Sequence, residues 1–266
     1  MIFYKTAVVL VITFGFLSCS SDDSSSENTT LFDVSLTEGS HWVYDVINEI
    51  ENTRDSIYIS NDTVINTKTY KKLKTKANLA TGFYSSSLRN NGIRWNDGKL
   101  FLSGDLALAS GAELGLNFDL TLDDFIILNK NASTGQQLST KNGSFQENIN
   151  GLPLTITYTL KSFAGENFSN FTSPNGDAYT DVKSTIIKLN ATVTMVQDLF
   201  GVPLTITVLA PQDVIVSTQY IASGIGVVHT NTDTSYSINS TIADEYELPE
   251  SDSQNQKEYL VDYQIN

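Results

Sequence analysis

Short alternating segments rich in Val, Ile, Thr, Tyr and Phe run through this chain almost from end to end, and helical periodicity is scarce. A side-chain repeat of two is the pattern of a strand with one buried face, whereas a helix repeats about every 3.6 residues. In the stretch HWVYDV, for example, Trp42, Tyr44 and Val46 fall on one face. Such segments follow one another without helical crossovers, which favours antiparallel pairing over βαβ units.

Turn-forming pairs between these segments predict β-hairpins. Asp97-Gly98 supplies the positive φ angles that a two-residue hairpin turn requires. The heptapeptide GLPLTIT at 151–157 returns as GVPLTIT at 201–207, and Asn150-Gly151 is a further hairpin pair. We interpret the two copies as similar hairpins in one sheet, and chance similarity between β-rich segments is the alternative.

Other segments have weaker patterns. Residues 106–116 fit a strand, a loop or one helical turn, so the fate of 103–143 stays open, although a polar loop is predicted over 129–143. Residues 243–256 are acidic and predict an exposed loop, whereas 259–265 alternate as a final strand. The predicted fold class is all-β, an antiparallel sheet built from meander hairpins with little helix.

The first eighteen residues have the pattern of a secretory signal peptide, in which Lys5 is the single charged side chain and 6–17 are uncharged. A helix of about twelve residues rises only ~18 Å, less than the ~30 Å hydrocarbon core of a bilayer. The predicted organisation is a signal peptide at 1–18, a lipidated cysteine and flexible tether at 19–31, and a single β-rich domain at 32–266.

The sequence Phe16-Leu17-Ser18-Cys19 resembles a bacterial lipobox, although Phe16 stands where the pattern usually has Leu. The resemblance implies that Cys19 is acylated and becomes the mature N-terminus. Cys19 is the only cysteine, so a disulfide within the chain is impossible and a free cysteine in a linker is the alternative. Two or three acyl chains would hold the protein firmly to a membrane, because each buried CH₂ contributes ~0.8 kcal/mol.

The stretch SSDDSSSENTT that follows Cys19 has no apolar residue and predicts a tether. Its first four residues, Ser20, Ser21, Asp22 and Asp23, resemble the acidic export signal that follows the lipidated cysteine in lipoproteins of the Bacteroidota. That resemblance implies display on the outer face of the outer membrane. The alternative is an anchor that faces the periplasm, with the two aspartates only solvating the tether.

A wider resemblance rests on GSHWVY at 39–44, DTVIN at 62–66 with Tyr70 after it, YTDV at 179–182 and YIASGIGVV at 220–228. Over most of its mature length the chain resembles uncharacterised surface lipoproteins of the Bacteroidota. The resemblance implies a sheet curled into an open half-barrel, somewhat like that of lipoprotein carriers. These motifs are structural and carry no chemistry.

Charge excludes one class of partner. Without Lys5 the chain carries 15 basic and 30 acidic residues, a net charge of −15. Nucleic-acid binding needs a basic footprint, so we expect none. The acidity also disfavours docking of side chains on an anionic lipid surface. The expected partners are a membrane, through the acyl chains on Cys19, and a glycan, protein or lipid ligand.

Motifs for catalysis are missing from the sequence. No G-x-S-x-G elbow is present, and His41 and His229 lack the spacing of metal ligands. Asp123-Asp124 is the tightest pair of carboxylates, but neighbours on a strand point to opposite faces, so a solvated acidic turn is the better interpretation. We therefore expect no enzymatic activity, no cofactor and no metal.

Trp42, Tyr44 and Trp95 could form a ligand-facing aromatic platform, although a place in the sheet core is the favoured interpretation for both tryptophans. The leading hypothesis is a lipid-anchored, surface-exposed and non-enzymatic binding or structural module of the cell envelope. Its rival is a carrier or sensor of an apolar ligand in the concave face of a half-barrel. A carbohydrate-active enzyme, with two carboxylates converging in a cleft, is the third alternative.

Overall fold

The computed structural model describes residues 32–110, 116–149 and 151–266, and the compact unit spans Phe32–Asn266. Its strands are β1 His41–Ile47, β2 Asn52–Ile65, β3 Lys68–Thr75, β4 Gly92–Asn96, β5 Lys99–Ser110, β6 Leu116–Asn129, β7 Gln137–Ile149, β8 Leu152–Thr172, β9 Ala178–Leu199, β10 Val202–Ala222, β11 Gly226–Ser237 and β12 Ser251–Gln264. The helices are a 3-10 turn η1 Lys76–Asn78, α1 Phe83–Leu88 and α2 Ser240–Glu245.

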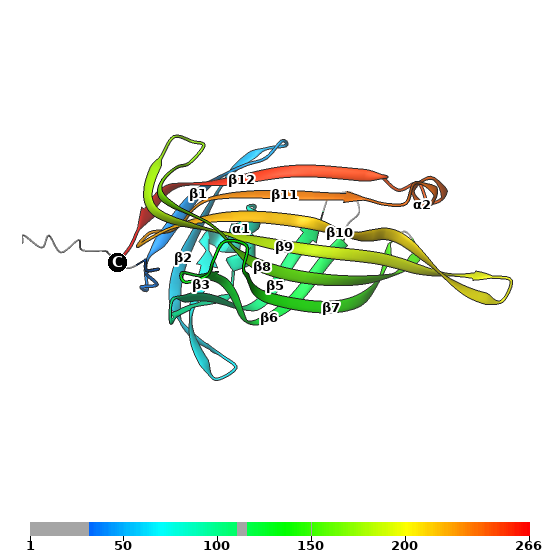
Figure 1. Cartoon of the computed structure of the whole chain (residues 1–266), viewed down its shortest axis with the longest axis horizontal. Helices are drawn as coiled ribbons and strands as arrows, with labels where there is room; N and C mark the ends of the chain where they lie inside the picture. The colour runs from blue at the N-terminus through cyan, green and yellow to red at the C-terminus, as the bar shows by residue number, and fades with distance from the viewer. Residues whose placement is uncertain (1–31, 111–115, 150) are drawn as a thin grey trace, which may run out of the picture. The chain divides into compact units, whose positions relative to one another are not determined.

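All twelve strands belong to one antiparallel sheet in the order β6-β5-β4-β3-β2-β1-β12-β11-β10-β9-β8-β7 (Figure 1). Strand β1 pairs with β12, so two meanders are joined along the first and last strands of the domain. The two edges of the sheet are β6 and β7, which follow each other in the sequence. The sheet therefore curls until its edges approach, and the prediction of an all-β fold with a curled antiparallel sheet is confirmed.

We call the line between β6 and β7 the seam. No backbone ladder joins the described parts of these two strands. At one end Ile126 N donates to Ser139 Oγ at 3.1 Å, and Ser162 Oγ donates to Ile126 O at 2.5 Å. Elsewhere the buried ring of Phe118 on β6 packs edge-on against Phe145 on β7 and Tyr158 on β8, with centroids 5.8 and 6.1 Å apart. Side chains thus close a barrel-like sheet that its backbone leaves open.

The predicted turns and faces agree with the structure. Asp97 and Gly98 have φ of 50° and 68°, as a two-residue hairpin turn demands. The two GxPLTIT copies begin β8 and β10, the second strands of the β7–β8 and β9–β10 hairpins, so the interpretation as similar hairpins in one sheet is confirmed. The face of β1 that holds Trp42, Tyr44 and Val46 is buried.

Two predicted loops are wrong in part. Residues 137–143 belong to β7, and 243–256 include the end of α2 and the start of β12. Strand β7 lies at the edge of the sheet and has no fully buried side chain among its residues, so its sequence lacks apolar alternation. The first half of β12 faces a polar cavity, described below, rather than an apolar core.

In the undecided segment 106–116, residues 106–110 belong to β5 and Leu116 begins β6. Among the described residues, no helix is long and apolar enough to cross a membrane.

Candidate binding site

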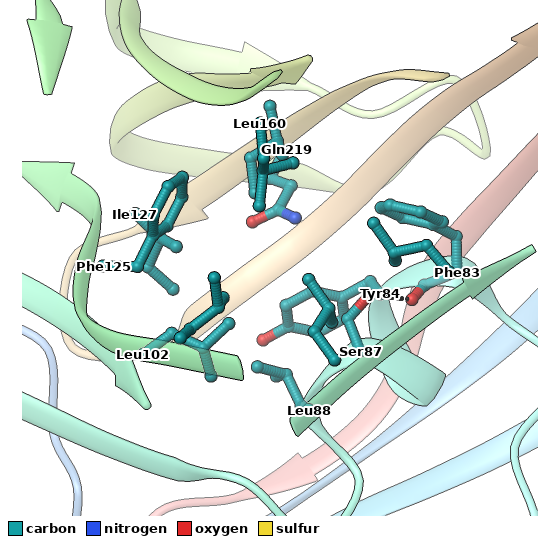
Figure 2. A pocket seen from close by; sticks show the side chains of 13 residues that line it. Phe83, Tyr84, Ser87, Leu88, Leu102, Phe125, Ile127, Leu160 and Gln219 are labelled. Atoms are coloured by element: carbon teal, nitrogen blue, oxygen red, sulfur yellow. Dashed lines mark hydrogen bonds between the residues drawn. The ribbon is translucent and has the colours of Figure 1, made fainter. Parts of the chain in front are cut away.

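Helix α1 lies against the inner face of the curled sheet. Figure 2 shows its side chains Phe83, Tyr84 and Leu88 on one side of a small cavity, and residues of β5, β6, β8 and β10 on the other. Tyr84 also packs edge-on against Tyr44 of β1, with ring centroids 5.6 Å apart. A six-residue helix is too short to be stable alone, so these contacts and the polar ones described next hold it in place.

The approach to α1 is fixed by the buried carboxylate of Asp55 on β2. Its Oδ2 accepts hydrogen bonds from Thr81 N at 2.9 Å and from Gly82 N at 2.8 Å. The Thr81 hydroxyl donates to Oδ1 of the same carboxylate at 3.2 Å. Asp55 therefore binds backbone groups that have no partner within the helix.

A second buried carboxylate, Glu258 on β12, holds the helix itself. Its Oε1 accepts from Tyr84 N at 2.7 Å and its Oε2 accepts from Ser85 Oγ at 2.7 Å. Burial raises the pKa of Glu258 to about 7, and the nearby charge of Asp55 adds to this rise. The carboxylate occupies the space where a side chain at residue 82 would stand, which explains the glycine there.

A polar cavity of about 580 Å³ opens beside α1. It lies between the start of α1, the β1–β2 turn and the inner face of β11 and β12. Residues 252–256 of β12 all line it, but the side chain of Asn255 is turned to Asp233 of β11, to which it donates at 2.7 Å. Its polar lining includes Thr232 and Thr234 of β11 and Asp252, Gln254 and Gln256 of β12.

The cavity has a fixed rim and one apolar side. Gln256 Oε1 accepts from Phe83 N at 2.6 Å, and Gln256 Nε2 donates to Thr81 O at 3.2 Å. Phe83 and Leu108 supply apolar surface. The hydroxyls and amides can both donate and accept, so the lining suits a ligand with many hydroxyl groups.

Apolar space inside the sheet is much smaller. Two apolar cavities beside α1 measure about 20 and 30 Å³, which is room for about one water each. Leu160, Ile187 and neighbouring side chains fill the surrounding volume. Neither of these two cavities could accept an acyl chain.

Two of the predicted aromatic residues lie deep in the core. Trp42 Nε1 donates to Ile225 O at 2.6 Å, and Tyr44 OH donates to Val227 O at 2.8 Å. Both residues line the apolar cavity of about 30 Å³, which is too small to hold a ligand. The polar atom of each side chain is already hydrogen-bonded to a backbone carbonyl. Trp95 lies apart from them on β4, half-buried, with its ring centroid 6.4 Å from that of Phe32. The structure does not bring the three together.

The predicted lipidation and export residues, Cys19, Ser20, Ser21, Asp22 and Asp23, lie outside the described residues. Those predictions remain predictions. The described residues contain no group of three or more His, Cys, Asp or Glu side chains that could hold a metal ion.

The interpretation of Asp123-Asp124 as a solvated turn is wrong for Asp124. Asp124 lies within β6 at a positive φ of 49°, and its carboxylate binds Lys68, Tyr70 and Arg94. Partial burial alone would raise the pKa of Asp124, but these three partners lower it to about 2. Sequence reasoning missed this cluster because its partners come from two other strands, β3 and β4.

His229 is buried. Its ring stacks between those of Tyr220 and Tyr259 on the outer face, with centroids 5.4 and 4.7 Å away, and Phe171 stacks on Tyr220 at 4.5 Å. Burial lowers the pKa of His229. His41 is half-buried on β1.

No protein-family model, no curated protein and no solved structure matches the chain. The geometry of the candidate binding site is therefore the main guide to function.

Proposed function

We propose that this protein is a lipid-anchored, non-enzymatic binding protein of the outer cell surface, and that it binds a neutral saccharide in the polar cavity. The observation that carries the ligand class is the lining of that cavity: Thr234 and Gln254, with the already hydrogen-bonded Thr232 and Gln256 beside them, line about 580 Å³ of open space next to the Phe83 ring. Such a mixture of uncharged donors and acceptors suits hydroxyl groups on every side of a ligand.

The charge of the protein supports a neutral ligand. The chain has a net charge of −14, and Glu49 and Asp252 at the cavity outnumber Arg89. An anionic ligand would meet an unfavourable field. The apolar-carrier hypothesis draws less support, because the apolar cavities beside α1 are too small for an acyl chain.

Binding is tested with the full chain and a panel of neutral hexose oligosaccharides in titration calorimetry. Substituting Gln254→Met keeps the side-chain length but removes the amide, and we expect affinity to fall about fivefold, since a hydrogen bond contributes roughly 1 kcal/mol and about 1.4 kcal/mol equals tenfold. The control Ser235→Ala changes an exposed residue of β11 and should leave affinity unchanged. Equal affinities in all three proteins, or no binding to any member of the panel, would contradict the proposed ligand.

The same panel tests the third alternative, because Glu49 and Asp252 both line the cavity. Release of shorter sugars during incubation, abolished by Asp252→Asn, would show a carbohydrate-active enzyme instead.

The anchor has its own test. We expect cells that produce the chain to incorporate labelled palmitate into it and to retain it in the membrane fraction. Cys19→Ser should abolish the label and release the protein, because one thiol is the sole acceptor. Label retained by the Cys19→Ser protein, or an unmodified Cys19 peptide in mass spectrometry of the membrane-derived protein, would refute the anchor without affecting the ligand proposal.

A further inference from the structure

The β9–β10 hairpin extends beyond the rest of the sheet as a two-stranded ribbon, residues 196–207, which we call the arm (Figure 1). Within it Leu199 pairs with Val202, and Gln197 pairs with Leu204. The β8–β9 ladder ends at Met195 and the β10–β11 ladder ends at Ile215, so in the described sheet neither outer edge of the arm has a strand beside it. Two strands alone are marginally stable in water.

One face of the arm is apolar and uncovered. Leu199, Val202 and Leu204 share this face, because directly paired residues point the same way, and they are 47, 64 and 49 % exposed. The same face continues into the core, where Met195 is buried. The apolar face therefore continues from the buried core into the arm, where the domain no longer covers it.

In the first copy of the repeated sequence, the corresponding apolar side chains are buried. Leu152 and Leu154 stand where the second copy has Val202 and Leu204, and they are only 9 and 5 % exposed. The same sequence pattern is thus buried in the β7–β8 hairpin and exposed to solvent in the β9–β10 hairpin.

The turn of the arm adds an independent observation. Phe200 and Gly201 have φ of 57° and 83°, the two-residue turn in which Asn-Gly or Asp-Gly is preferred. A non-glycine residue without a short polar side chain costs about 1–2 kcal/mol in that conformation. Phe200 is also 100 % exposed. In an isolated domain, asparagine at residue 200 would give a more stable turn than this large apolar side chain.

We propose that the arm is a self-association surface on which two copies of this chain pack their apolar faces about a two-fold axis. Apart from Gln197 this face is apolar, and a largely apolar face can be complementary to itself, which is what a two-fold interface requires. Asp198 is the one charged residue of the arm in a chain of net charge −14. Two such acidic molecules therefore meet with the least repulsion through their arms.

The size of the patch sets the strength of the association. Monomers rarely expose an apolar patch larger than roughly 300–600 Å². If the arm's apolar face is of that size, burying two of them together would remove about 600–1,200 Å² from water, which is the range of weak and reversible interfaces. The lipid anchor proposed above would favour such a dimer, because molecules confined to one surface have a high effective concentration.

A lipid bilayer is a poorer occupant of this face. The arm has no Lys or Arg to attract anionic headgroups. Asp198 Oδ1 accepts a hydrogen bond from Gly201 N at 2.6 Å, so the carboxylate is part of the tip and would enter the bilayer with Phe200. An aspartate in the bilayer centre costs about 2.5–3.5 kcal/mol.

The test places single cysteines on the two faces of the arm in the full-length chain, in membranes of producing cells. Gln197→Cys lies on the apolar face beside Leu204, and Thr205→Cys lies on the opposite face beside Val196. A short bis-maleimide reagent should yield covalent dimers from Gln197→Cys at least five times as abundant as from Thr205→Cys. The chain without either substitution reports any reaction at Cys19.

Adding Phe200→Asn to Gln197→Cys provides the decisive comparison, because asparagine suits the turn and should not harm the fold. We expect the cross-linked fraction to fall at least tenfold while the thermal midpoint stays the same or rises. Equal cross-linking on the two faces, no cross-linking at either position, or cross-linking that persists with Phe200→Asn would overturn the proposal. Flotation of the protein with added phosphatidylcholine vesicles that Phe200→Asn abolishes would also overturn it, in favour of a membrane contact.

Discussion

Replacing Phe118 with alanine is expected to lower the free energy of unfolding by about 3–5 kcal/mol, the usual loss for a buried phenylalanine. The Phe118 ring is fully buried and makes edge-on contacts with Phe145 and Tyr158 across the seam. Because no backbone ladder joins β6 to β7 there, the cavity left by the ring would face strands that little else holds together. We therefore expect both a global loss of stability and a local opening of the seam.

Urea unfolding measures the global loss, and hydrogen exchange of β7 amides against those of β12 measures the local one. The matched control is Phe171→Ala, which removes a half-buried ring that stacks on Tyr220 at the outer face. The control should cost less than half as much and leave exchange in β7 unchanged. A loss below about 1 kcal/mol for Phe118→Ala, or equal losses for the two variants, would show that side chains at the seam do not hold the sheet closed.

The sequence was a good guide where each strand buries one face. In β1 the alternation of Trp42, Tyr44 and Val46 with less buried residues follows directly from the pleat, and the structure buries that face. Turn chemistry is similarly local, so Asp97-Gly98 could be assigned before the sheet was known. Both signals depend only on neighbours in the sequence.

Alternation gave no guide to strands that lack an apolar partner. Strand β7 has a free edge, and the first half of β12 faces the polar cavity, so both consist largely of Ser, Thr, Asn, Gln and charged residues. Their sequences resemble loops because the pattern records burial rather than backbone pairing. Helix α1 was equally hidden, since six residues are too few to show a helical period.

The candidate site could not be assembled from the sequence at all. Its walls come from residues 81–83, 232–234 and 252–256, which meet because β1 closes onto β12 and β12 onto β11. Such pairing of the first and last strands is set by the whole sheet. One local signal did exist: Gln256, Glu258 and Leu260 share a face by alternation, which places a carboxylate on the inward side of a strand.

The second large effect concerns pH and comes from that carboxylate. Burial raises the pKa of Glu258 from an ordinary 4.5 to about 7, so the folded protein binds a proton that the unfolded chain releases. The resulting stability is fully present below about pH 4.5 and is lost as pH rises through about 7. A shift of that size corresponds to about 3 kcal/mol. Because pH 5 already lies above 4.5, we expect Glu258 to contribute most of that difference, about 2–3 kcal/mol, between pH 5 and pH 8.

The measurement is the free energy of unfolding from pH 5 to pH 8 for the natural chain and for Glu258→Gln. Subtracting the two is essential, because the pKa of His229 is lowered by burial and that group acts in the opposite direction, stabilising the fold as pH rises. Asp124, with its pKa lowered to about 2, changes the stability only below this range. The control Glu250→Gln alters an exposed carboxylate and should follow the natural chain. If the difference between the natural chain and Glu258→Gln did not change between pH 5 and pH 8, Glu258 would have to titrate normally, and a solvated carboxylate could not hold the start of α1 as the structure shows.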